Sequence, residues 1–286
     1  MRRSATKIIA LAAGVAAVMS TARAETMAVA DFAQHTHIHG LAVDRQDPSR
    51  LLIATHHGLF RATADGKAER VSEIQDFMGF LPHPADRAVL FASGHPRQGG
   101  NLGFIASRDG GKSWQQVSPG MNGPVDFHQI AMSDGDPNRV YGVYGGLQVS
   151  RDAGRSWSLI GPAPERLIAL AASARDPDRL YAATESGLLV SRDAGRTWKP
   201  LLAGVPVTLV AAMPDGSLYA FAVRRGLLRA AEEGHDFTTV NSELKNGYLL
   251  HLTIDPANPS RMFAVNNQGR VVTSSDGGRG WSLFGN

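Results

Sequence analysis

Three histidines occupy alternate positions in the stretch "HTHIHG" at residues 35–40, directly before the apolar run "LAV". The whole chain contains ten histidines, so three within five residues form a candidate site for chemistry. If the segment is extended, its two-residue period places His35, His37 and His39 on one side. Neutral imidazole nitrogens bind Zn, Cu, Ni and Fe ions. The stretch therefore indicates either a metal site or a tail that chelates by chance, and its place in the fold decides between them.

The first 24 residues have the pattern of a cleaved export signal. A basic start (Arg2, Arg3, Lys7) precedes an apolar stretch at residues 8–19, and "ARA" at 22–24 fits the small-residue cleavage rule. The apolar stretch is too short to span a bilayer, and no later segment is long enough. We expect a mature chain that begins near Glu25, is periplasmic or secreted, and has no transmembrane segment.

Charge and cysteine content narrow the function classes. The expected leader holds four basic residues and no acidic ones, so its removal changes the net charge from +3 to −1. The basic sequence pI therefore gives no support for a nucleic-acid partner. Cysteine is absent, which excludes disulfides, thiolate metal ligands and a thiol nucleophile. The chain must obtain its stability from its core, and it is long enough to do so as one domain.

Internal repetition is the strongest signal in the chain. The strings "SRDGGKSW" (107–114), "SRDAGRSW" (150–157), "SRDAGRTW" (191–198) and "SSDGGRGW" (274–281) fit S-x-D-x-G-x-x-W and contain all four tryptophans. Degenerate copies start at 63 and 230, which makes the spacing between successive starts 39–44 residues. We call the four complete copies the tryptophan motifs. A period of this length, built from short strands, is typical of propeller blades.

Each repeat has the same order of elements. An apolar strand is followed in four units by a turn such as Asp47-Pro48, then by a second strand, a glycine turn, a third strand that enters the motif, and a last strand. Six such units run from about residue 37 to the C-terminus. They predict an all-β, six-bladed propeller of four-stranded antiparallel blades, forming one domain over residues 25–286. Residues 27–32 ("MAVADF") could add a strand near the C-terminal blade, although "GWSLFGN" already supplies an outer strand there.

These repeats resemble the Asp-box (BNR) propellers, which include bacterial sialidases, sortilin-type domains and photosystem II assembly factor-like proteins. The resemblance covers nearly the whole mature chain and implies that the motif is a structural turn. It implies that Ser and Asp close the turn, that Gly supplies its unusual backbone angles, and that Trp is buried between sheets. The residues concerned are Ser107, Asp109, Gly111, Trp114, Ser150, Asp152, Gly154, Trp157, Ser191, Asp193, Gly195, Trp198, Ser274, Asp276, Gly278 and Trp281.

Alignment of the six units brings the histidines to one face of the predicted propeller. His39, Met78 and His128 take the same position at the entry of the innermost strand in units one to three, where the later units have Ile168, Leu209 and Leu250. Residues two positions earlier, and in the turn after the second strand, are expected to surround them: His35, His37, His56, His57, Asp76, His95, Asp126, Tyr144, Arg166 and Glu185. His83 and His235 are assigned to other surfaces.

Three functions fit this predicted mouth of the central channel. The first is binding of one Cu or Zn ion by His37, His39, Met78 and His128, with the thioether favouring copper. The second is a sialidase-like glycoside hydrolase, with Tyr144 or Tyr248 and Glu185 as nucleophile pair and Asp76 or Asp126 as acid. The F-R-I-P string and arginine triad of that family are missing. The third is a non-catalytic scaffold or assembly factor that binds a protein or small ligand. In each case we expect a monomer.

Overall fold

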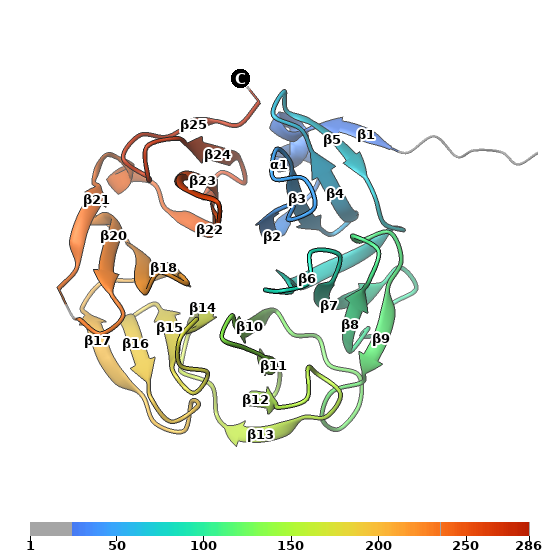
Figure 1. Cartoon of the computed structure of the whole chain (residues 1–286), viewed down its shortest axis with the longest axis horizontal. Coiled ribbons are helices and arrows are strands. Elements are labelled where there is room, and N and C mark those ends of the chain that lie inside the picture. Colours follow the sequence, from blue (N-terminus) through green and yellow to red (C-terminus); the bar gives the residue numbers. More distant parts are fainter. Residues whose placement is uncertain (1–24, 235, 286) are drawn as a thin grey trace, which may run out of the picture.

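The computed structural model describes residues 25–234 and 236–285, and it confirms the predicted six-bladed propeller (Figure 1). Five blades are four-stranded antiparallel sheets, and the first blade has a fifth strand. Blades one to three consist of β2 Ile38–Val43, β3 Leu51–Thr55, β4 Gly58–Ala62, β5 Lys67–Arg70; β6 Gln75–Pro82, β7 Leu90–Pro96, β8 Phe104–Ser107, β9 Gln115–Ser118; and β10 Gln129–Ser133, β11 Asp136–Val143, β12 Leu147–Ser150, β13 Ser158–Gly161.

Blades four to six repeat this order with nearly the same strand lengths. They consist of β14 Leu167–Ala172, β15 Leu180–Thr184, β16 Gly187–Ser191, β17 Lys199–Ala203; β18 Val207–Ala212, β19 Ser217–Ala222, β20 Gly226–Ala231, β21 Thr238–Asn241; and β22 Leu249–Asp255, β23 Asn258–Asn266, β24 Val271–Ser274, β25 Ser282–Leu283. The first strand of every blade lies innermost, around the channel (Figure 1).

The N-terminal residues join the first blade and not the last one. Strand β1 (Thr26–Ala28) pairs with β5 of the first blade. The strand considered for residues 27–32 beside the C-terminal blade therefore does not form. A 3₁₀ turn (Val29–Asp31) and the short helix α1 (Phe32–His35) then lead to β2. The extended geometry considered for residues 35–39 is therefore wrong at its start, since His35 ends a helix. The second 3₁₀ turn is Glu243–Asn246, and within the described residues no helix is long and apolar enough to cross a membrane.

The ring closes by side-chain packing between the first and last blades. Phe32, Ile38 and Phe60 share one buried cluster with Phe263 and Val265 of blade six. Every described blade is otherwise built from consecutive strands, so no strand is exchanged to close the ring. Burial of apolar surface at this junction, which contributes roughly 25 cal/mol per Å², stabilises the closed ring in place of a shared strand.

The tryptophan motifs form four nearly identical hydrogen-bonded turns. In the first, Ser107 Oγ donates to Asp109 Oδ1 at 2.8 Å and accepts from the Gly111 amide at 2.8 Å. Asp109 Oδ1 accepts from the amides of Lys112 and Ser113, both at 3.0 Å. The Ser–Asp and Ser–Gly bonds recur in the motifs that begin at Ser150, Ser191 and Ser274. The turn is thus closed by its own side chains, between the third and fourth strands of the blade.

Each motif glycine combines a left-handed backbone with close contact to the preceding blade. Gly154 has a φ of +85°, and an added Cβ would lie 2.1 Å from Cε1 of Phe104. A Cβ at Gly111 or Gly195 would similarly lie 2.3 Å from a leucine methyl of the blade before. Glycine is therefore required on two independent grounds.

The motif tryptophans are half-buried, and each packs against a core cluster formed by two neighbouring blades. The Trp157 ring contacts Phe127 and Phe104, with centroids 4.7 and 5.3 Å away. Its Nε1 donates to the carbonyl of Gly154 at 3.0 Å. The ring therefore covers the outer end of the interface between blades two and three, with one edge in solvent.

We expect Gly154→Ala to lower the free energy of unfolding by about 3 kcal/mol, because it adds both left-handed strain and overpacking against Phe104. Gly161→Ala is the matched control, since its Cβ would meet no atom within 4 Å and its φ is not positive. The control should change stability by no more than about 0.5 kcal/mol. Guanidinium unfolding of both variants checks this, and equal midpoints would contradict the packing described.

Candidate functional site at the channel mouth

In four of the blades, a bulge at the start of the inner strand leaves one residue outside the strand ladder. In β2, Ile38 pairs with Thr55 and Gly40 with Ala54, so His39 is the extra residue. The pairings of β14, β18 and β22 skip Ile168, Thr208 and Leu250 in the same way. Leu209 was predicted at this position, and the structure corrects it to Thr208, because Leu209 stays in the ladder opposite Phe221 and is buried between blades.

These bulged residues line a cavity of about 550 Å³, which we call the channel mouth. Blades one to three contribute His37, His39, Met78 and His128, and blades four to six contribute Ile168, Thr208, Leu250 and His251. Asn267, Gln268 and Gly269 of the β23–β24 turn complete the rim. Blades one to three therefore give the mouth three imidazoles and a thioether. Blades four to six give it apolar side chains together with a hydroxyl, an imidazole and two amides, so the apolar half that the alignment indicated forms only in part.

The first cluster consists of His39, His56 and Asp76, from β2, the β3–β4 turn and β6. His39 Nε2 lies 3.1 Å from His56 Nε2, and His56 Nδ1 lies 2.7 Å from Asp76 Oδ2. The exposed ring of His37 is close, with its centroid 5.3 Å from that of His56. Three imidazoles and one carboxylate thus meet where blades one and two adjoin.

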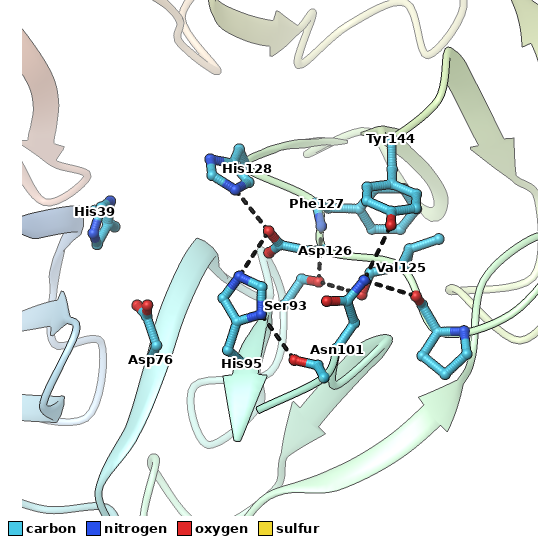
Figure 2. Close-up of polar contacts among 12 residues, drawn as sticks. His39, Asp76, Ser93, His95, Asn101, Val125, Asp126, Phe127, His128 and Tyr144 are labelled. Atoms are coloured by element: carbon cyan, nitrogen blue, oxygen red, sulfur yellow. Dashed lines mark hydrogen bonds and ion pairs between the residues drawn. The ribbon is translucent and has the colours of Figure 1, made fainter. Parts of the chain in front are cut away.

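The second cluster consists of His95, Asp126 and His128, from β7 and the segment that enters β10. Asp126 Oδ2 contacts both imidazoles, at 2.6 Å from His128 Nε2 and 3.0 Å from His95 Nε2. His95 Nδ1 donates to the carbonyl of Gly100 at 2.8 Å. Figure 2 shows this cluster beside His39 and Asp76, and Asp76 pairs with His95 in the register of β6 and β7.

Both aspartates hold a carboxylate oxygen that is buried and lacks a hydrogen-bond donor. Oδ1 of Asp76 and Oδ1 of Asp126 each have less than 1 Å² of accessible surface and no partner among the described residues. A buried, unpartnered charged oxygen costs about 1–3 kcal/mol or more. Such an atom beside imidazoles indicates that a cation or a donor completes each cluster.

Burial and hydrogen bonding shift the histidine pKa values in opposite directions. Burial, reinforced by the neighbouring His56, lowers the pKa of His39 to about 4. Burial also lowers the pKa of His251 to about 4. The Gly100 carbonyl, with the Asp126 carboxylate, raises the pKa of His95. At neutral pH His39 and His251 therefore offer uncharged imidazoles.

The structure separates the residues predicted to share one ion. His39 and His128 each belong to a different cluster, and Met78 lies in the cavity wall with 9% of its surface exposed. His35 and His57 are exposed. His83 caps its own turn by accepting from the amides of Ala85 and Asp86, and His235 lies outside the described residues. The predicted four-residue ligand set stays a prediction.

The residues proposed for glycosidase chemistry are engaged elsewhere. Glu185 forms an exposed ion pair with Arg166, and within the described chain it has no hydrogen bond to Tyr144 or Tyr248. The Tyr144 hydroxyl accepts from Asn101 at 3.2 Å. The tyrosine–glutamate nucleophile pair is therefore not assembled in this structure.

Sequence reasoning missed the parts of the mouth that bulges and backbone carbonyls supply. The alignment placed Leu209 at the mouth where the structure has Thr208. It also did not identify Gly100, whose carbonyl orients His95. The "GG" at 99–100 in a turn after a histidine was the only visible cue.

No protein-family model and no curated protein matches the sequence of this chain. Solved structures do match its fold. A GH74 xyloglucanase from Xanthomonas campestris matches 91% of this chain (TM-score 0.59, 18% identity), and this chain covers 47% of that enzyme. YCF48 from Cyanidioschyzon merolae matches 87% of this chain and is itself covered to 84% (TM-score 0.53, 14% identity). A structural genomics protein of unknown function from Bacteroides thetaiotaomicron matches 83% and is covered to 68% (TM-score 0.59, 11% identity).

These likenesses place the chain among six-bladed β-propellers and show the fold alone. The chain spans about half the length of the GH74 enzyme. The candidate site of this chain is the pair of histidine–aspartate clusters at the channel mouth.

In chelator-treated protein, NMR titration should give His39 and His251 midpoints near pH 4, and His95 a midpoint above 6.5. The lowered pKa values of His39 and His251 mean that these two groups bind fewer protons in the folded state than in the unfolded chain. The stability that they contribute is therefore full above pH 6.5 and falls as the pH drops towards 4. The same protein in denaturant is the control, where all histidines should titrate near 6.5. A His39 midpoint at or above 6.5 would contradict the burial described.

Proposed function

We propose that this protein binds a transition-metal ion, zinc or copper, at the first cluster of the channel mouth. The observation that carries the proposal is the 3.1 Å separation of His39 Nε2 and His56 Nε2. Two nitrogens held at ~2.0–2.1 Å from one ion lie ~2.9 Å apart at a right angle and ~3.4 Å apart at the tetrahedral angle. The observed separation lies between these values, so the two rings fit one ion with little movement.

The other contacts of His56 support the same reading. Its Nδ1 lies 2.7 Å from Asp76 Oδ2, and the carboxylate therefore holds the hydrogen on Nδ1. Nε2 of His56 then carries a lone pair directed at His39. A carboxylate that fixes the tautomer of a histidine in this way is the usual arrangement behind a ligating imidazole. Asp76 thus orients a ligand, and its buried Oδ1 remains available to the ion.

His37 and Met78 are the candidates for further ligands. The exposed His37 ring reaches the cluster by side-chain rotation, since its centroid is 6.5 Å from that of His39. Met78 lines the same cavity, and its thioether would favour copper over zinc. We propose a site made by imidazole nitrogens, with a sulfur at its edge.

The wider setting of the site is also proposed. The four tryptophan motifs with their shared Ser–Asp–Gly hydrogen bonds support assignment to the Asp-box repeat class. The leader expected at residues 1–24 lies outside the described residues. If it directs export, the site works in the periplasm or outside the cell, where this chain would bind, store or deliver the metal.

Calorimetric titration of chelator-treated protein with Zn²⁺ tests the site. His39→Ala and His56→Ala should each remove one molar equivalent, because each deletes a ligand. Asp76→Asn should weaken that equivalent by about 10–100-fold without removing it, because it loses only the orienting carboxylate. His83→Ala is the matched control, since His83 lies beyond the opposite end of β6 from Asp76. Unchanged binding in His56→Ala, or equal loss in the control, would refute the proposal.

Met78→Leu separates copper from zinc. The substitution keeps an apolar side chain of similar volume but removes the sulfur, which only the soft Cu(I) ion gains from. Competition with a chromogenic Cu(I) chelator should show weaker Cu(I) binding, while Zn²⁺ binding stays the same. Equal effects on both ions would show that the thioether is part of the cavity wall alone.

A further inference from the structure

We infer that the second cluster, His95–Asp126–His128, is a separate divalent-cation site with a two-histidine, one-carboxylate ligand set. It shares the channel mouth with the first cluster but uses none of its residues. The inference therefore stands whether or not His39 and His56 bind an ion. Its evidence lies in how the two imidazoles and the carboxylate face one another.

The orientation of His95 is fixed by the main chain. Its Nδ1 donates to the Gly100 carbonyl at 2.8 Å, which requires the hydrogen on Nδ1. In neutral His95 the lone pair of Nε2 then points at Asp126 Oδ2, 3.0 Å away. Two lone pairs that face each other at this distance repel, so a cation must lie between them, either a second ring proton or a metal ion. A backbone carbonyl on the far nitrogen is also the typical second partner of a metal-ligating histidine.

Asp126 is buried and incompletely hydrogen-bonded, as expected of a carboxylate that binds a cation. Its side chain is 8% exposed, yet Oδ1 has no hydrogen-bond partner and Oδ2 is shared by two imidazoles. Within the described residues no Lys or Arg forms an ion pair with it. A buried carboxylate that has no permanent cation is costly, because the Coulomb attraction that would offset its desolvation is missing. A bound divalent ion removes that cost.

His128 supplies the movable third ligand. Its Nε2 lies 2.6 Å from Asp126 Oδ2, a hydrogen-bond distance and shorter than the ~2.9 Å between two ligands at a right angle around one ion. The ring is 57% exposed, so it can rotate to bring a nitrogen to an ion bound by His95 and Asp126. Its exposed side faces the channel mouth.

The donor set selects the class of ion. Two imidazoles and one carboxylate suit Zn²⁺, Fe²⁺ or Mn²⁺, and with three protein ligands they leave coordination positions open to the mouth. A carboxylate ligand disfavours Cu(I), which prefers sulfur and nitrogen. The two clusters would therefore differ in preference, with the imidazole-rich first cluster able to take copper and the second restricted to divalent ions.

Titration of the chelator-treated full chain with Zn²⁺ and with Co²⁺ tests the inference. Wild type should bind two equivalents. His95→Gln and Asp126→Asn should each bind one, and His56→Ala should bind the other one. Co²⁺ bound by His56→Ala should give a visible spectrum that differs from that of Co²⁺ bound by Asp126→Asn, because the two variants keep different clusters with different ligands. Circular dichroism should show that the variants remain folded, since His95 is 39% exposed and lies outside the blade cores.

The outcomes separate the two sites. Loss of one equivalent in His95→Gln but not in His56→Ala would support the second site and refute the proposed function at the first. Loss in His56→Ala alone, with His95→Gln and Asp126→Asn binding as much as wild type, would overturn the inference. The same holds if wild type binds only the one ion that His56→Ala removes. In that case the lone pairs of His95 and Asp126 are separated by a proton.

Discussion

The contact between a motif glycine and the core of the preceding blade sets how closely neighbouring blades approach. Gly111, Gly154, Gly195 and Gly278 each lie against a leucine or phenylalanine of the blade before, at a distance that excludes a Cβ. Ser and Asp close the turn around this glycine with the same bonds in all four copies. These contacts hold the outer part of each of these blades against the blade before it, and the inner strands surround one channel (Figure 1).

The channel mouth depends on that arrangement and on a local defect in the inner strands. In blades one, four, five and six a bulge at the strand entry places one extra residue outside the ladder, and these four residues line the mouth. Bulges of this kind re-aim side chains at functional sites. In blade one the residue is His39, and in blades four and six it is Ile168 and Leu250. The same backbone device thus presents a histidine in one blade and apolar side chains in two others.

Electrostatics explains why the donors of blades one to three divide into two clusters. Asp76 and Asp126 are each held beneath imidazoles, with one carboxylate oxygen bonded and the other buried without a partner. Two carboxylates that shared a single cluster would repel, whereas one for each pair of histidines is compensated locally. The histidines accordingly differ: the pKa of His39 is lowered by burial, and that of His95 is raised by the Gly100 carbonyl.

The sequence by itself determined the blade count, the turn chemistry of the motifs and the face on which histidines gather, because each follows from a period or a residue type that repeats along the chain. Only the tertiary structure decided which histidines meet. His56 and Asp76 are 20 residues apart and His95 and Asp126 are 31 apart, so no local pattern pairs them. The bulge that selects Thr208 over Leu209, and the carbonyl of Gly100 that orients His95, are backbone features set by packing. Single residue types do not encode them, because a bulge depends on how two strands pair and the direction of a carbonyl depends on how its loop folds.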